Sequence, residues 1–164
     1  MRIERINPKT VSIGPLDLLY CEFLHEIRAA ADPGGNDAAR QRLFPSPTNG
    51  GLPELDRDWL EYVEPGLNEW FISCLQIVER DLTGFPGDQP DPFGSTLQIP
   101  FDHLEAWIHA LNQARITLGV RYNFTEADMN EEIPIEGQER SLALFQEHFY
   151  GVLIECFLRI LDGK

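Results

Sequence analysis

The segment from residue 99 to residue 121 constrains the fold more than any other part of the chain. Its large apolar side chains recur every three or four residues, which places them on one face of an α-helix: Leu104, Trp107, Ile108, Leu111, Ala114 and Leu118. Asp102, with Glu105 three residues later, forms a capping-box pattern at its start, and Gly119 is a typical helix stop. The apolar face must be buried, so we predict that the other elements pack around this helix.

The first thirteen residues predict a small β-hairpin. Residues 2–6 and 10–13 alternate polar and apolar side chains, and they are separated by three turn-forming residues, Asn7, Pro8 and Lys9. A two-stranded hairpin is only marginally stable in water, so it needs a further strand or a helix to lie on. Residues 96–99 are the candidate third strand, because Thr-Leu-Gln-Ile before a proline echoes Thr-Val-Ser-Ile before glycine and proline.

Three further segments have the apolar content of long helices. Residues 15–31, with Pro15 in the first turn, and residues 66–82 each place apolar side chains on one face. Residues 141–161 are apolar on nearly every side and leave only a narrow polar strip, through Glu147, Gly151, Glu155 and Arg159. Such a helix lies at the centre of a bundle or in a subunit interface. We expect the centre, and keep a homodimer through this helix as the alternative.

Two short helices are predicted between the long ones. The first ends at Leu43, with Asn36 or Asp37 as its cap, and the second covers residues 54–63. Pro65 should kink or separate this second helix from the one that follows, because a proline inside a helix removes a hydrogen bond and clashes with the preceding turn.

The helical patterns and the length together favour one mainly α domain over residues 1–164, a helical bundle with a small N-terminal hairpin. A chain of 164 residues with 43% hydrophobic content is large enough for one core. No apolar run is long enough to span a membrane, and the N-terminus lacks a signal-peptide pattern, so we expect a cytoplasmic protein. The three cysteines, which are far apart and lie in apolar helical patterns, predict no disulfide framework: Cys21, Cys74 and Cys156.

The charge balance excludes some classes of partner. With 13 basic and 27 acidic residues the formal net charge is −14, which repels nucleic acid and anionic membranes. We therefore predict no nucleic-acid and no membrane partner. The acidity suits a basic partner protein, and it also serves solubility alone.

Asn112 and Arg115 form a polar pair beside the apolar face of the helix in residues 99–121. In one interpretation Arg115 pairs with a carboxylate from another helix and Asn112 bonds a loop backbone, because buried polar groups need partners. In the other, Arg115 with Arg121 captures an anionic ligand or a partner's carboxylate through its planar guanidinium. We expect the first, and keep Asn112, Arg115 and Arg121 as the candidate binding residues.

Metal sites are not favoured. His103, Glu105 and His109 have ligand chemistry, but histidines six residues apart lie about 120° apart around a helix, whereas the zinc motif keeps two on one face. The acidic connection places oxygen ligands at EF-hand positions, Asp128, Asn130, Glu132, Glu136 and Glu139. Ile133 stands where that loop needs glycine, and Pro134 follows, so we predict no metal and no cofactor.

No catalytic motif is present: the chain has no glycine-rich phosphate loop, no Gly-x-Ser-x-Gly elbow and no Cys-x-x-Cys. The three tryptophans fall within amphipathic patterns and are predicted core residues, Trp59, Trp70 and Trp107. The first functional hypothesis is a protein-interaction or regulatory, adaptor-like module that is not an enzyme. The alternative is a small-molecule or metal-dependent enzyme with a site near His103, His109 and Arg115.

Several of these residues resemble a known family. The likeness rests on residues 42–45, Arg-Leu-Phe-Pro, and on a set in the long helix, Trp107, Ala110, Leu111, Asn112, Arg115, Leu118, Gly119 and Arg121. They are similar to an uncharacterised bacterial family, the domain of unknown function DUF2017. The resemblance implies a small, mainly helical protein without assigned activity, and, through genes near the adaptor of the Clp protease, a link to regulated proteolysis. The acidic insertion between Arg121 and Ser141 departs from the usual members.

Overall fold

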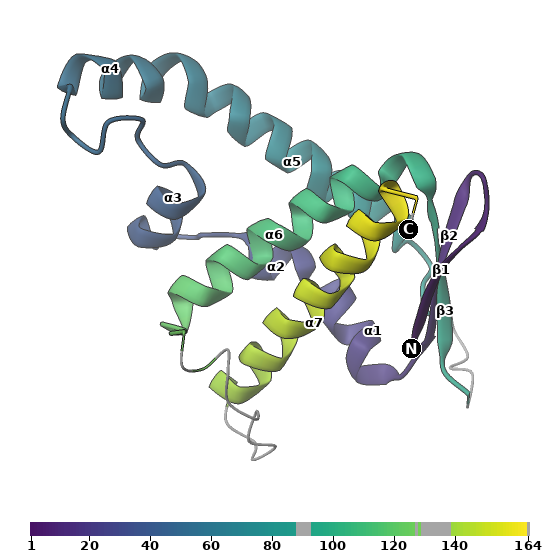
Figure 1. Ribbon diagram of the computed structural model, residues 1–164. Helices are drawn as coiled ribbons and strands as arrows, with labels where there is room; N and C mark the ends of the chain where they lie inside the picture. The colour runs from purple at the N-terminus through teal and green to yellow at the C-terminus, as the bar shows by residue number, and fades with distance from the viewer. Residues whose placement is uncertain (88–92, 127, 129–138, 164) are drawn as a thin grey trace.

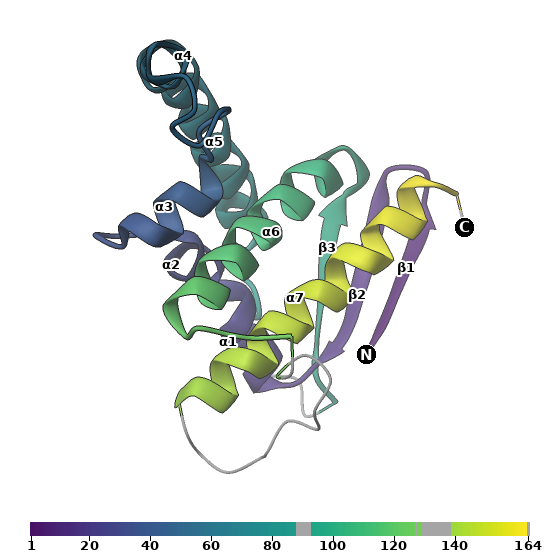
Figure 2. The same ribbon diagram turned by 60° about the vertical axis from the view of Figure 1, so that its left-hand side comes forward.

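The computed structural model describes residues 1–87, 93–126, 128 and 139–163, and it is mainly helical with one antiparallel sheet (Figure 1). In chain order the elements are β1 (Arg2–Asn7), β2 (Thr10–Leu16), α1 (Leu18–His25), α2 (Ile27–Ala31), α3 (Asp37–Leu43), α4 (Pro53–Asp58), the π-helical segment η1 (Trp59–Val63), α5 (Glu64–Asp81), β3 (Ser95–Pro100), the 3₁₀ turn η2 (Phe101–His103), α6 (Leu104–Arg121) and α7 (Glu139–Leu161). Figure 2 shows the sheet on one side of the fold, α7 beside it, α6 next, and α4 and α5 leading away from the other side. The predicted mainly α fold with a hairpin is confirmed.

The sheet has β2 in the middle, with β1 and β3 antiparallel on either side. Its register pairs Val11 with Ile99 and Ile13 with Leu97. Since alternate side chains of a strand point to the same face, all four residues are buried in the core shared with the helices. Residues 96–99 therefore supply the predicted third strand.

The predicted helix over residues 15–31 is wrong at its start and in its middle. Pro15 lies in β2, and α1 begins after Asp17, whose carboxylate accepts a 3.1 Å hydrogen bond from the Tyr20 N–H. A break at Glu26 then separates α1 from α2. Proline is tolerated both at a strand end and in a first helical turn, because its missing N–H is not needed in either place. Pairing with β3 decided between the two.

Helix α6 lies at the centre of the described fold, in contact with α2, α3, α5 and α7. The helix ends at Arg121, the last residue of the predicted segment, but both predicted end signals are wrong. No side-chain cap bond is made at the start of η2 or of α6, so Asp102 does not form the capping box. The helix also continues past Gly119 and closes at Asn123, which has a φ of 50°, while the Phe124 N–H bonds the Gly119 carbonyl at 2.9 Å. A left-handed asparagine ends this helix, as in many helix C-termini.

Helix α7 buries one residue of the strip that its sequence pattern left polar. Tyr150, Leu153 and Phe157 are fully buried, and Glu147, predicted in the polar strip, is 3% exposed. Three of its apolar residues are half exposed instead, Leu142, Val152 and Leu158. Because nearly every side of this helix is apolar, the periodicity did not select the buried face; contacts with α6, α1 and β1 did.

Among the remaining helices, α3 has its predicted cap, and α4 continues into α5. Asn36 caps α3, since its side chain accepts a 3.0 Å hydrogen bond from the Ala39 N–H. Pro65 does not separate α4 from α5: the Glu64 N–H bonds the Trp59 carbonyl five residues back, which makes the wide turn of η1. Pro65 then falls in the first turn of α5, where no N–H is required. The three elements form one long helical rod that bends between α4 and α5 (Figure 1), so the predicted kink is found but not the separation.

Candidate functional site

A polar groove of about 540 Å³ lies where α3, α6 and α7 meet. Its lining includes four of the twelve residues that carry the family resemblance, together with a buried glutamate of α7: Arg42, Asn112, Arg115, Gly119 and Glu147. The contact between α3 and α6 brings Arg42, from the Arg-Leu-Phe-Pro stretch, to the same groove as Asn112 and Arg115.

Arg115 and Glu147 line the groove as an ion pair between α6 and α7. Nε and Nη2 of Arg115 donate to the same Glu147 oxygen, Oε1, at 2.7 and 2.6 Å. The Glu147 side chain is 4% exposed, and its Oε2 has no hydrogen-bond partner among the described residues. Gly151 makes room for the guanidinium, because a Cβ there would lie 3.3 Å from Arg115 Cζ. The prediction that Arg115 pairs with a carboxylate of another helix is confirmed.

Arg42 and Asn112, like Asn123 at the end of α6, are polar residues that line the groove. Arg42 and Asn112 are the two that belong to the residues of the family resemblance. Both are exposed, and neither makes a side-chain hydrogen bond or ion pair within the part of the chain that the structure describes. The expected bond from Asn112 to a loop backbone is therefore not found among these residues. What the groove can offer chemically is a guanidinium and an amide beside an already paired arginine.

Arg121 does not share the groove. Its Nη2 donates to the carbonyls of Asp32, at 2.9 Å, and Ala29, at 3.4 Å, so it ties the end of α6 to the end of α2. Cationic side chains stabilise the carbonyl end of a helix in this way. The structure thus brings Asn112 and Arg115 together and places Arg121 elsewhere.

The histidines of α6 and η2 belong to another junction. Asp81 of α5, 6% exposed, accepts a 2.8 Å hydrogen bond from Trp107 Nε1, and His103 Nδ1 lies 2.9 Å from the same carboxylate. His109 packs its ring against Trp70, with centroids 4.4 Å apart. Twelve residues separate His103 from Arg115, about 18 Å along a helix axis, and neither histidine lines the groove. Sequence reasoning missed Asp81, which carried no motif.

Among the described residues no group of three His, Cys, Asp or Glu side chains is placed to hold a metal. Of the EF-hand positions only Asp128 and Glu139 are described; the others lie outside. Hydrogen bonds from the Thr125 hydroxyl and N–H, together with Arg140, lower the pKa of Asp128 from its usual value to about 2. Glu139 accepts a 2.7 Å hydrogen bond from the Tyr122 hydroxyl.

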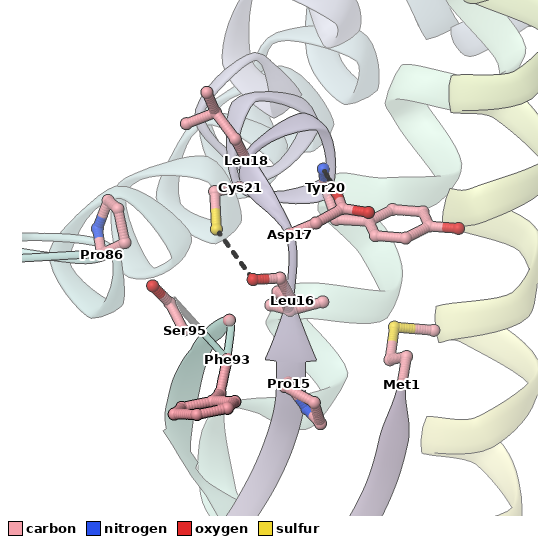
Figure 3. Close-up of a pocket in the computed structure, with 11 residues that line it drawn as sticks. Met1, Pro15, Leu16, Asp17, Leu18, Tyr20, Cys21, Pro86, Phe93 and Ser95 are labelled. Carbon is pink, nitrogen blue, oxygen red and sulfur yellow. Dashed lines mark hydrogen bonds between the residues drawn. The ribbon is translucent and has the colours of Figure 1, made fainter. Parts of the chain in front are cut away.

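A second cavity, of about 430 Å³, opens between the end of β2, the start of α1 and the start of β3 (Figure 3). Apolar side chains form most of its wall: Met1, Pro15, Leu16, Leu18, Tyr20, Pro86 and Phe93. The Cys21 thiol points to the Leu16 carbonyl at 3.9 Å, and burial raises its pKa, which disfavours the reactive thiolate. Asp17 on the rim is occupied as the cap of α1. These features suit the binding of an apolar side chain better than a catalytic reaction.

The most unusual surface is the outer part of the rod, residues 52–70, which we call the arm. Figure 2 shows it standing away from the sheet and from α7. Its main contacts are within the rod, with the loop held by Asp56 and with Arg40, which pairs with the buried Glu64. Six large apolar side chains of the arm are exposed, Leu52, Leu55, Leu60, Tyr62, Val63 and Trp70.

The sequence-based interpretation of this region was only partly right. Trp107 is a fully buried core residue, as predicted, but Trp70 is 43% exposed and Trp59 is half buried. Apolar residues do recur along the arm at four-residue steps, Leu55, Trp59, Val63 and Leu67. This periodicity predicted a helix, but nothing in the neighbouring sequence indicated that no other element would pack on its apolar side.

Within the described ranges, no helix combines the length and apolar character that crossing a membrane requires. Comparison of the chain with curated proteins and with solved structures finds no match. Among protein families, the one described as domain of unknown function (DUF2017) matches residues 13–161. This range includes the groove and the arm and confirms the resemblance. The chain therefore belongs to the DUF2017 family.

Proposed function

We propose that residues 1–164 form one helical domain that acts in the cytoplasm as a protein-interaction module, with the arm as the docking surface for its partner. The observation that carries this proposal is the exposure of large apolar side chains on the arm: Leu55 is 51%, Leu60 57% and Tyr62 72% exposed. Soluble proteins rarely expose contiguous apolar patches, and where they do the patch commonly serves an interaction. The proposed role of such a docking module is regulatory or adaptor-like.

A homodimer through α7 has less support than docking on the arm. The exposed apolar residues of α7 are ten and six residues apart, Leu142, Val152 and Leu158. At about 100° per residue these spacings put them on different sides of the helix, so they form no continuous stripe. The arm, in contrast, exposes six large apolar side chains within 19 residues, Leu52, Leu55, Leu60, Tyr62, Val63 and Trp70, and Leu55 with Tyr62 and Val63 with Trp70 are seven residues apart, two turns along one side of a helix.

The groove offers a second, smaller contact. We propose that Asn112 and the adjacent Arg42 bind a carboxylate of the same partner, since both are exposed and free of described partners. To this carboxylate contact Arg115 adds only the N–H groups that Glu147 leaves free, and Arg121 bonds the carbonyls at the end of α2 instead. The arm remains the main surface because it offers far more apolar area.

The test is purification of the tagged full chain from its native host, in parallel with variants. Leu55→Ser with Leu60→Ser removes apolar surface from the arm, and Leu18→Ser with Leu158→Ser is the matched control, exposed to a similar degree elsewhere. We expect one protein to co-purify with the wild type and the control but not with the arm variant, and to bind again when both are purified. Circular dichroism confirms that each variant is folded.

Two results bear on the details. Arg42→Ala with Asn112→Ala should weaken the capture of that protein without abolishing it. A protein that binds the arm variant as tightly as the wild type would show that the arm is not the docking surface.

A further inference from the structure

We infer that the segment that docks on the arm is a basic amphipathic helix of a partner protein; this inference rests on the proposed function. The arm is a continuous helical segment that bends between α4 and α5 (Figure 1) and has apolar residues at four-residue steps, and helices pack on such surfaces by inserting ridges into grooves. Followed along its helical path, it runs about 27 Å from residue 52 to residue 70, the length of five turns of a partner helix.

The negative charge of the arm favours a partner segment with positive charge. The arm also carries four exposed acidic residues, Glu54, Asp58, Glu61 and Glu69, and Arg57 is the one basic residue between 52 and 70. None of these four carboxylates has a hydrogen-bond or ion-pair partner within the described ranges. The other two acids of the arm are already used, Asp56 by the loop at Thr48 and Glu64 by Arg40.

A second copy of this chain is the less suitable occupant. Two arms packed together would bring unpaired carboxylates against carboxylates, and the whole chain carries a formal charge of −14. Juxtaposed like charges disfavour a complex, whereas a partner with lysine or arginine beside its apolar stripe gains attraction and faster association. Apolar contact thus supplies most of the affinity, and the exposed acidic residues of the arm favour a basic partner over an acidic one.

The experiment measures binding of two labelled peptides to the full chain by fluorescence anisotropy. Both are amphipathic helices of about 18 residues with the same leucine pattern. One has lysine at every polar position, and the other has glutamate. We expect the lysine peptide to bind more tightly than the glutamate peptide, with affinity that falls as salt increases.

Charge variants separate the arm from the general acidity of the chain. Glu54→Gln, Asp58→Asn and Glu61→Gln together should weaken binding of the lysine peptide about tenfold. The matched control, Glu22→Gln, Asp102→Asn and Glu105→Gln, removes the same charge from exposed positions off the arm and should change binding less than about twofold.

The outcomes distinguish this inference from the proposed function. If both peptides bind equally and Leu55→Ser with Leu60→Ser abolishes both, the arm docks helices without regard to charge, and only the inference fails. If light scattering shows a dimer that the arm variant disrupts, a second copy is the occupant and the inference is overturned. If neither peptide depends on the arm leucines, both proposals fail.

Discussion

Arg115 and Glu147, from two different helices, hold each other through two short hydrogen bonds that end on a single carboxylate oxygen. The arginine is one-third exposed, whereas the glutamate is almost completely buried. Arg115 therefore keeps a buried charge paired, and this explains why a polar residue interrupts the packing between α6 and α7.

Arg115→Ala should destabilise the protein by about 2 to 3 kcal/mol, because it leaves the buried Glu147 carboxylate without its cation. Urea unfolding monitored by circular dichroism measures this loss. Arg42→Ala, in the same groove but exposed, should change stability by less than about 0.5 kcal/mol. An Arg115→Ala protein as stable as the wild type would instead favour ligand capture as the role of Arg115.

Phe149→Ala should cost about 3 to 5 kcal/mol, since it removes a buried ring that packs on Tyr20, with centroids 4.7 Å apart, and on Phe23. Val152→Ala, on the exposed side of the same helix, should cost less than about 0.5 kcal/mol. The same urea titration compares the two. A loss below about 1 kcal/mol for Phe149→Ala would contradict the assigned face of α7.

Gly119→Ala should stabilise the protein by about 0.5 to 1 kcal/mol. Gly119 lies inside α6, and a Cβ there meets nothing within 4 Å. Asn123→Ala should cost about 1 kcal/mol, because the left-handed backbone at residue 123 is unfavourable for a Cβ without a polar side chain. The opposite order of the two melting temperatures would place the helix end at Gly119.

Asp128 predicts a specific acid sensitivity. Its pKa of about 2 in the folded chain lies below the usual value of about 3.9 in an unfolded chain. Its contribution to the free energy of unfolding is therefore complete above the unfolded pKa and is lost as the pH falls toward 2. Asp128→Asn should therefore lower the melting temperature near neutral pH, and the gap to wild type should close between about pH 5 and pH 2. Glu22→Gln is the exposed control. A gap for Asp128→Asn that does not change with pH would contradict the hydrogen-bonded state of this carboxylate.

Local sequence predicted most elements of this fold. Alternation and turn residues predicted the hairpin and its third strand, and helical periodicity predicted α6 and α7 to within a few residues. Asn36 was a readable cap because capping depends on a residue and its next three neighbours. Arg115 was singled out from the pattern, and its need for a carboxylate followed from the cost of burying a charge without a partner.

Tertiary structure decided the rest, because burial depends on residues far away in the chain. Pairing with β3 kept Pro15 in a strand, and Arg115, 32 positions before Glu147, drew that glutamate into the core. Asp81 became a shared acceptor only when α5 and α6 packed together. The arm is the clearest case: its periodicity encodes a helix in the usual way, but whether an apolar side is covered depends on what packs against it. Here the rod leads away from the rest of the fold, and the apolar side stays exposed.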